Sequence, residues 1–282
     1  MAPFPSSSVQ AARSALAARL RDLRLDAGLT GRELAAQAVW QPSKVSRLEN
    51  AKTPPSDADI RMWCRVCGAE DQAPDLIAAS RTAESMYVQW RRLQRSGLRR
   101  LQESRVPLYE RTRVFRVYCA SVVPGLLQTD EYATSLLTNI TEFHGTPDDV
   151  GEAVAARLAR SRVIREGDHR FAFLLEESVL RHVVGGVETM AGQLGYLLAS
   201  MAFPAVSLGI IPAGAPRKMW TLETFNVFDE DRVHVELLTA AVSVTAPGEV
   251  AQYVGAFAAM AELAVYGSAA RARITAAIDS LG

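Results

Sequence analysis

A nine-residue segment with the sequence PSKVSRLEN alternates apolar side chains with groups that can donate hydrogen bonds to a partner. At helical spacing Val45 and Leu48 would point inward. The outward or sideways positions hold Ser43, Lys44 and Arg47. An arginine can bond two acceptors on guanine, which is worth ~1–3 kcal/mol of discrimination between bases. These residue types suit contact with nucleic acid, although a charged helix face exposed to solvent is the plain alternative.

The elements around this segment predict a small all-α domain of five helices. Gly28 is expected to end the first helix. Thr30 and Glu33 form the capping box T-x-x-E at the start of the second, and Ser56 is expected to cap the fourth. The predicted helices cover residues 9–27, 31–38, 42–50, 57–66 and 73–93.

A helix-turn-helix window of twenty residues runs from Gly31 to Asn50. Its two helices pack at a steep angle, so certain positions must be apolar and one must be small. The small position holds Ala35. The apolar positions hold Leu34, Ala38, Trp40, Val45 and Leu48.

The stretch LRDLRLDAGLTGRELAAQAVWQPSKVSRLENAKTPPS resembles the Xre family of lambda-repressor-like regulators, over roughly residues 15–70. The pattern GLT…ELA…SKVSRLEN carries the resemblance. It implies that Ser43, Lys44 and Arg47 lie where base edges are read, although Lys44 and Ser43 could serve either bases or phosphates. The residues that would hold the phosphate backbone are Thr30, Gly31, Gln41, Lys52 and Thr53.

Two positions depart from the family pattern. Val39 stands where the turn usually holds glycine, and Ala51 stands where glycine is common after the third helix. Because a β-branched residue disfavours positive φ, the turn either has another backbone shape or carries strain of order ~1 kcal/mol. Asn50 is expected to adopt a left-handed cap.

The remainder of the chain predicts a mixed α/β domain, because short apolar strands alternate with helices. The expected strands cover 113–123, 171–178, 206–212, 223–231 and 232–238, and the expected helices cover 124–137, 148–166, 187–201, 246–266 and 268–281. The predicted organisation is a flexible N-terminus (1–14), a helix-turn-helix domain (15–95), a linker helix (96–106) and a C-terminal α/β regulatory or partner-binding domain (107–282).

This second part has a resemblance of its own, over residues 107–280. The blocks VPGLLQTDEYA, AARLARSRVI, LEESVLRHVVGG with the following QLGYLL, and IIPAG occur in order. They resemble the C-terminal domain of unknown function of actinobacterial Xre regulators, the WhiJ-like, antitoxin-like proteins. The resemblance implies developmental or specialised-metabolism regulation, often with a small neighbouring partner protein, and it supplies no ligand.

Charge is distributed unevenly along a chain whose formal net charge is zero. Residues 1–105 hold 17 Lys and Arg against 11 Asp and Glu, whereas residues 106–282 hold 14 against 20. Only the first part is therefore expected to meet phosphates. Three cysteines, no signal-peptide pattern and no long apolar run indicate a cytoplasmic protein without a membrane segment.

Other chemistry is expected to be absent, so we predict no metal, no cofactor and no enzymatic activity. Cys64 and Cys67 lack further ligands for zinc and are expected to pack in a helix. Side chains that could assemble a metal site, but more simply form ion pairs, are Glu176, Glu177, His182, His234 and Glu236. The arginines expected to lie along a packed helix, with an anion or partner site as the alternative, are Arg157, Arg160, Arg162 and Arg165.

Taken together, the sequence predicts a sequence-specific DNA-binding transcriptional regulator whose C-terminal domain senses a ligand or binds a partner. One short helix reads few bases, so we expect a homodimer that contacts half-sites ~34 Å apart on double-stranded DNA. Two alternatives stay open: an antitoxin-like interaction protein that sequesters a small partner and uses DNA binding for autoregulation, and an enzyme that has kept a helix-turn-helix.

Overall fold

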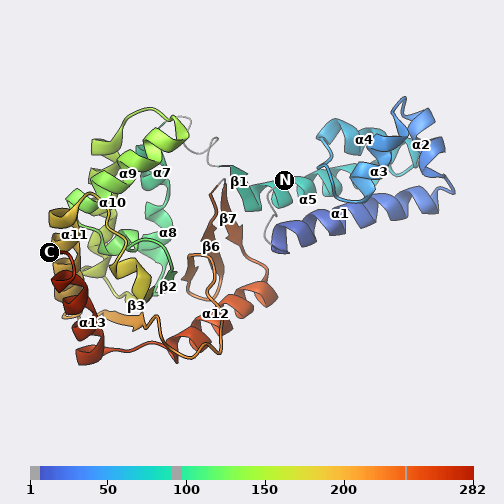
Figure 1. The fold of residues 1–282 in the computed structure, drawn as a ribbon. Coiled ribbons are helices and arrows are strands. Elements are labelled where there is room, and N and C mark those ends of the chain that lie inside the picture. The colour runs from blue at the N-terminus through green and yellow to red at the C-terminus, as the bar shows by residue number, and fades with distance from the viewer. Residues whose placement is uncertain (1–6, 90–96, 239) are drawn as a thin grey trace. The chain divides into compact units, whose positions relative to one another are not determined.

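A computed structural model describes residues 7–89, 97–238 and 240–282 of the chain (Figure 1). It divides into two units, Met1–Val88 and Gln89–Gly282. We call them the helical unit and the α/β unit. Each unit has its own buried cluster of apolar side chains.

The helical unit contains the five helices that the sequence predicts. They are α1 (Ser7–Asp26), α2 (Gly31–Gln37), α3 (Pro42–Glu49), α4 (Asp57–Val66) and α5 (Ala73–Met86), with a short 3-10 turn η1 (Glu70–Gln72) before α5. The centre of the core holds Leu20, Leu34, Ile60 and Trp63, all fully buried. The indole Nε1 of Trp63 donates a hydrogen bond to the Leu20 carbonyl at 2.9 Å, which ties α4 to α1.

Both ends of this unit differ from expectation. The first helix, expected over 9–27, begins at Ser7 because no proline or glycine interrupts the segment before Asp26, so it includes part of the predicted N-terminal stretch 1–14, of which residues 1–6 lie outside the described residues. The fifth helix ends at Met86 and not at Leu93, and the short strand β1 (Tyr87–Gln89) follows it across the boundary between the units. Residues 90–93 of the predicted helix lie outside the described residues.

Six strands of the α/β unit form a mixed sheet in the order β7-β6-β5-β2-β3-β4. The parallel strands are β2 (Val114–Cys119), β3 (Arg170–Glu176) and β4 (Val206–Ile211). The antiparallel strands are β5 (Phe225–Phe228), β6 (Arg232–Glu236) and β7 (Ala240–Val244). Phe115 lies opposite Phe171 on one side and Phe228 on the other, so aromatic side chains fill the middle of the sheet.

Helices and strands alternate along this unit, which confirms the mixed α/β class. The helices are α7 (Leu98–Ser104), α8 (Val106–Arg111), α9 (Asp130–His144), α10 (Val150–Arg160), α11 (Val187–Ser200), α12 (Pro247–Ala261) and α13 (Gly267–Asp279), with 3-10 turns η2 (Gly125–Leu127), η3 (Ser161–Ile164) and η4 (Glu177–Leu180). Residues of α8, α11 and α13 pack in one cluster with those of β2, β3 and β4. α12 packs against β4, β5 and β6.

Three predictions for this unit need correction. The helix expected to open at Pro124 begins at Asp130, because the Thr129 hydroxyl accepts a hydrogen bond from the Tyr132 amide and caps it there. Strand β7 was not expected at all. The segment expected as a linker helix, 96–106, contains α7, which packs within the α/β unit: Leu98 is buried beside Leu137.

Candidate nucleic-acid interface

The helix-turn-helix begins with α2, whose start and buried face the sequence predicts correctly. Thr30 and Glu33 form the expected capping box. Leu34, Ala35 and the inward residues of α3 are at most 2% exposed. Trp40 is half-buried, and its ring centroid lies 6.2 Å from that of Trp63. The apolar positions of the motif therefore fix α3 on the core of the helical unit.

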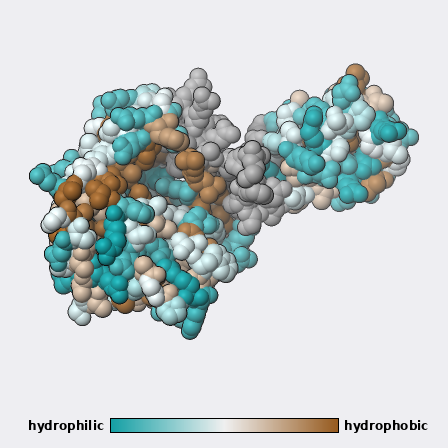
Figure 2. Space-filling view, viewed as in Figure 1, coloured by the Kyte–Doolittle hydropathy of each residue, from teal (hydrophilic) through white to brown (hydrophobic). Residues whose placement is uncertain are grey.

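The outer face of α3 presents the side chains that could reach bases. Ser43 and Arg47 are exposed, and within the described residues no carboxylate lies within ion-pair distance of Arg47. The surface of the helical unit is largely hydrophilic in Figure 2. Arg47 and Ser43 can thus meet a polar partner without first breaking an ion pair.

Lys44 is held differently from the other two predicted base-reading residues. Its Nζ lies 2.5 Å from Oδ1 of Asp59 on α4 and 4.1 Å from the centroid of the Trp40 ring. Burial opposes ionisation of Asp59, but the hydrogen bond from Lys44 holds the pKa of Asp59 below its ordinary value. The ion pair and the cation–π contact keep Lys44 half-buried, so contact with DNA would require it to leave Asp59.

At the start of α2, the predicted phosphate contacts of Thr30 and Gly31 share the helix end with a carboxylate. An oxygen of Glu33 accepts a hydrogen bond from the Thr30 amide at 2.7 Å. Hydrogen bonds from the Thr30 backbone and side chain hold the pKa of Glu33 below its ordinary value. A phosphate approaching this end therefore meets a negative charge as well as backbone N–H groups.

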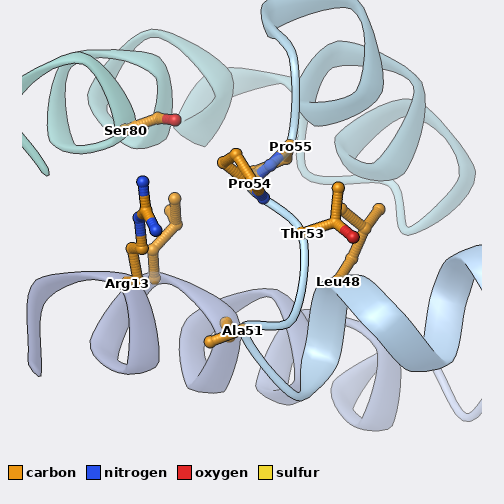
Figure 3. Close-up of a pocket in the computed structure, with 9 residues that line it drawn as sticks. Arg13, Leu48, Ala51, Thr53, Pro54, Pro55 and Ser80 are labelled. Carbon is orange, nitrogen blue, oxygen red and sulfur yellow. The ribbon is translucent and has the colours of Figure 1, made fainter. Parts of the chain in front are cut away.

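The other predicted phosphate contacts flank α3. Gln41 is the N-cap, it is exposed, and its side chain does not cap the helix. Lys52 and Thr53 are exposed in the loop after α3. Figure 3 shows how Pro54 and Pro55 carry this loop between α1 and α5. Together with Arg13 and Ser80 they enclose a space of about 10 Å³, which is room for a single water at most. This space is therefore too small to hold a ligand, and the prolines here serve to fix the loop.

The two departures from the family pattern, Val39 and Ala51, both adopt positive φ, of 55° and 52°. Each follows a helix whose last carbonyls accept two hydrogen bonds in a Schellman arrangement: Val39 and Trp40 donate to Ala36 and Ala35, and Ala51 and Lys52 donate to Leu48 and Arg47. These backbones have the shape that glycine favours, so the turn carries strain. The expectation that Asn50 takes the left-handed cap is wrong, since its φ is −100°.

An ion pair that the sequence did not indicate joins the end of α3 to α1. Arg24 donates to both carboxylate oxygens of Glu49, at 2.6 and 3.2 Å, and to the Leu29 carbonyl at 2.7 Å. The hydrogen bond that Arg24 donates to Glu49 raises the pKa of Arg24. The two residues are 25 positions apart, so no local pattern pairs them. The ion pair therefore ties the end of α3 to α1.

Comparison with known families matches both units. Residues 15–76 match the family described as a helix-turn-helix domain. Residues 106–276, more than half of the chain, match the family described as a domain of unknown function (DUF5753). The chain belongs to the DUF5753 family. The helix-turn-helix match covers every residue of α2 and α3 discussed above.

Comparisons with individual proteins add little for this DUF5753 member. No curated protein matches it. A solved structure described as TrmBL2, an archaeal chromatin protein with a novel mode of DNA binding, is 12% identical and covers 85% of this chain and 88% of that chain, with a TM-score of 0.31. Similarity at that level carries no argument about function.

The cysteines of this DUF5753 member lie in environments that suit packing. Cys64 is fully buried in α4, and Cys67 at the end of the helix is half-buried. Burial raises the pKa of both thiols, that of Cys67 to about 11. Thiols with raised pKa values are poor nucleophiles and poor metal ligands.

The carboxylates considered for a metal site are paired with arginines. Glu176 pairs with Arg217, and Glu177 pairs with Arg273. Burial and the Arg105 charge lower the pKa of His234 to about 4. Within residues 7–89, 97–238 and 240–282 no group of three His, Cys, Asp or Glu side chains is placed to hold a metal ion. In the same ranges no helix is long and apolar enough to span a bilayer.

Proposed function

We propose that this DUF5753 member is a sequence-specific transcriptional regulator of the Xre type that inserts α3 into the major groove of double-stranded DNA. The observation that carries the proposal is the position of Arg47. It lies on the exposed face of an eight-residue helix whose opposite face is buried. The contacts of Glu49 with Arg24 and of Trp40 with Trp63 support this helix at its end and its entry.

The proposal assigns a role to each part of the surface around α3. Arg47 and Ser43 read base edges, and Lys44 joins them once it leaves Asp59. Gln41, Lys52 and Thr53 hold the phosphate backbone, with Thr30 and Gly31 as weaker contacts because Glu33 shares their helix end. We infer that the protein acts as a homodimer, since one α3 reads too few bases. We also infer that it is cytoplasmic, and that a signal acts on the α/β unit by binding to it, without a catalysed reaction.

The experiment is a genome-wide pull-down of DNA bound to the full chain in its native host, with mass spectrometry of co-purifying proteins from the same sample. The proposal expects a small set of sites that share a pseudo-palindromic sequence. Recovery of DNA without a shared sequence would contradict it. A stoichiometric small protein with no enriched sequence would favour the antitoxin-like alternative.

A further inference from the structure

A cavity of about 220 Å³ opens in the α/β unit beside α7, α9 and α10. Its apolar lining comes from Leu98 and Leu101 of α7 and from Leu137 and Ile140 of α9. Its polar lining includes Arg157 of α10, with Arg105 and Glu236. The site lies within one unit, and its walls are the helices labelled together in Figure 1.

The charges next to this cavity are not balanced. Arg157 and Arg160 are 9% and 5% exposed, respectively, so both guanidiniums are buried. They donate to neutral groups, Arg157 to the side-chain oxygens of Gln128 and Gln102, and Arg160 to the Gln102 side chain and carbonyl. Within the described residues no carboxylate lies within 4.0 Å of either one.

The carboxylate that lines the cavity does not neutralise Arg157. Glu236 is paired with Arg105, at 2.9 Å. Burial and the neighbouring Arg160 charge lower the pKa of Arg157 to about 9. A buried charge loses its hydration, so an anion that entered the cavity would provide the counter-charge that the protein does not supply.

We infer that this cavity binds a small organic acid, with the carboxylate on Arg157 and an apolar body against the leucines of α7 and α9. A guanidinium binds a carboxylate through two parallel hydrogen bonds. The volume lies between the ~150 Å³ that accommodates benzene and the ~300 Å³ at which drug-sized sites begin. The ligand is therefore a monoanion with one ring or a short hydrocarbon chain.

Glu236 narrows the class of ligand further. Its carboxylate lies at the cavity, partly exposed, and would repel an anion with a second charge. This disfavours phosphate esters and dicarboxylates relative to simple carboxylates. The inference rests on the proposed function only in that the acid would serve as the regulator's signal.

Calorimetric titration of the full chain, without DNA, tests the site with benzoate and hexanoate against their neutral amides. At least one acid should bind while its amide does not. Arg157→Met should weaken binding on the order of a hundredfold, because it removes a desolvated charge pair. Ile140→Trp should block the cavity while it leaves Arg157 in place. Arg162→Gln, at the exposed position of the turn η3, is the matched control.

Each outcome decides the inference. Failure of both acids to bind overturns it, as does equal binding of an acid and its amide. Undiminished binding by Ile140→Trp also overturns it, whether or not Arg157→Met folds. Since DNA is absent from the titration, these results leave the α3 proposal to its own test.

Discussion

The Lys44 ammonium of α3 lies 2.5 Å from the Asp59 carboxylate of α4, in the helix-turn-helix of the helical unit. A residue that the family pattern places at the base edges is thus paired inside the protein before DNA arrives. Asp59 also accepts a hydrogen bond from the Ser56 amide at the start of α4. One carboxylate therefore stabilises a helix end and restrains a cation at the proposed interface.

Releasing that cation should strengthen binding to DNA of any sequence. In Asp59→Asn, Lys44 gains freedom to reach a phosphate, so log affinity against log salt should steepen by ~0.9. The measurement is a salt titration of binding to random-sequence duplex. Asp75→Asn also removes one negative charge from the first turn of a helix, here at an exposed position of α5, and serves as control. An identical slope for the two variants would mean that Lys44 does not reach the phosphates.

The same pair makes the helical unit sensitive to acid. The pKa of Asp59 is lower in the folded state than the ~3.9 of an unfolded chain. Its contribution to the free energy of unfolding is present above the unfolded value and is lost as pH falls through the folded one. Chemical unfolding between pH 5 and pH 2 should show a shallower loss of stability for Asp59→Asn than for wild type. Parallel curves of stability against pH for the two proteins would contradict a role of the Asp59 ion pair in acid sensitivity.

Replacing either of the two strained turn residues by glycine should stabilise the helical unit. Val39→Gly and Ala51→Gly each place the residue favoured at φ near +55° and should raise the free energy of unfolding by ~1 kcal/mol. Val39 is 90% exposed, so the change sacrifices little packing. Ala18→Gly, on the exposed face of α1, should lower stability by ~1 kcal/mol. Destabilisation by both turn variants would show that the strain is not there.

Breaking the Arg24–Glu49 pair should loosen α3 from α1. Glu49→Ala leaves a mostly buried guanidinium without its counter-charge and should lower the free energy of unfolding by ~2–3 kcal/mol. Glu70→Ala, an exposed carboxylate in η1, should change it by less than ~0.5 kcal/mol. Urea denaturation measures both. If both variants lower the free energy of unfolding by the same small amount, apolar packing alone keeps α3 against α1.

How much of this could be predicted from the sequence depends on the range of the interactions. The sequence predicts Thr30 and Ser56 as cap residues, and the capping box of Thr30 with Glu33, because capping joins residues three apart. The second box, of Ser56 with Asp59, was not predicted. The ion pairs of Lys44 and Arg24 cross between helices, and nothing local indicates them. The start of α9 was mistaken because Pro124 competes with Thr129 as a cap signal.

Long-range packing also explains what the sequence analysis missed in the α/β unit. Strand β7 is a short run of alanine, valine and serine, and its pairing with β6, a long-range contact, helps to make it a strand. For Arg157 and Arg160 the sequence predicts side chains that lie along a packed helix, with an anion or partner site as the alternative, but it does not indicate their hydrogen-bond partners. Their burial depends on Gln102 and Gln128, which come from distant segments.

The most direct test of the central claim, that α3 reads DNA through Arg47, is selection from a randomised duplex library with three proteins. Wild type should enrich one sequence motif. Arg47→Ala should enrich the same motif with one guanine position relaxed, at a cost of ~1–3 kcal/mol there, whereas Lys52→Ala should keep every position and bind more weakly throughout. If Arg47→Ala selects a motif indistinguishable from wild type, or if wild type selects none, α3 is not the reading element.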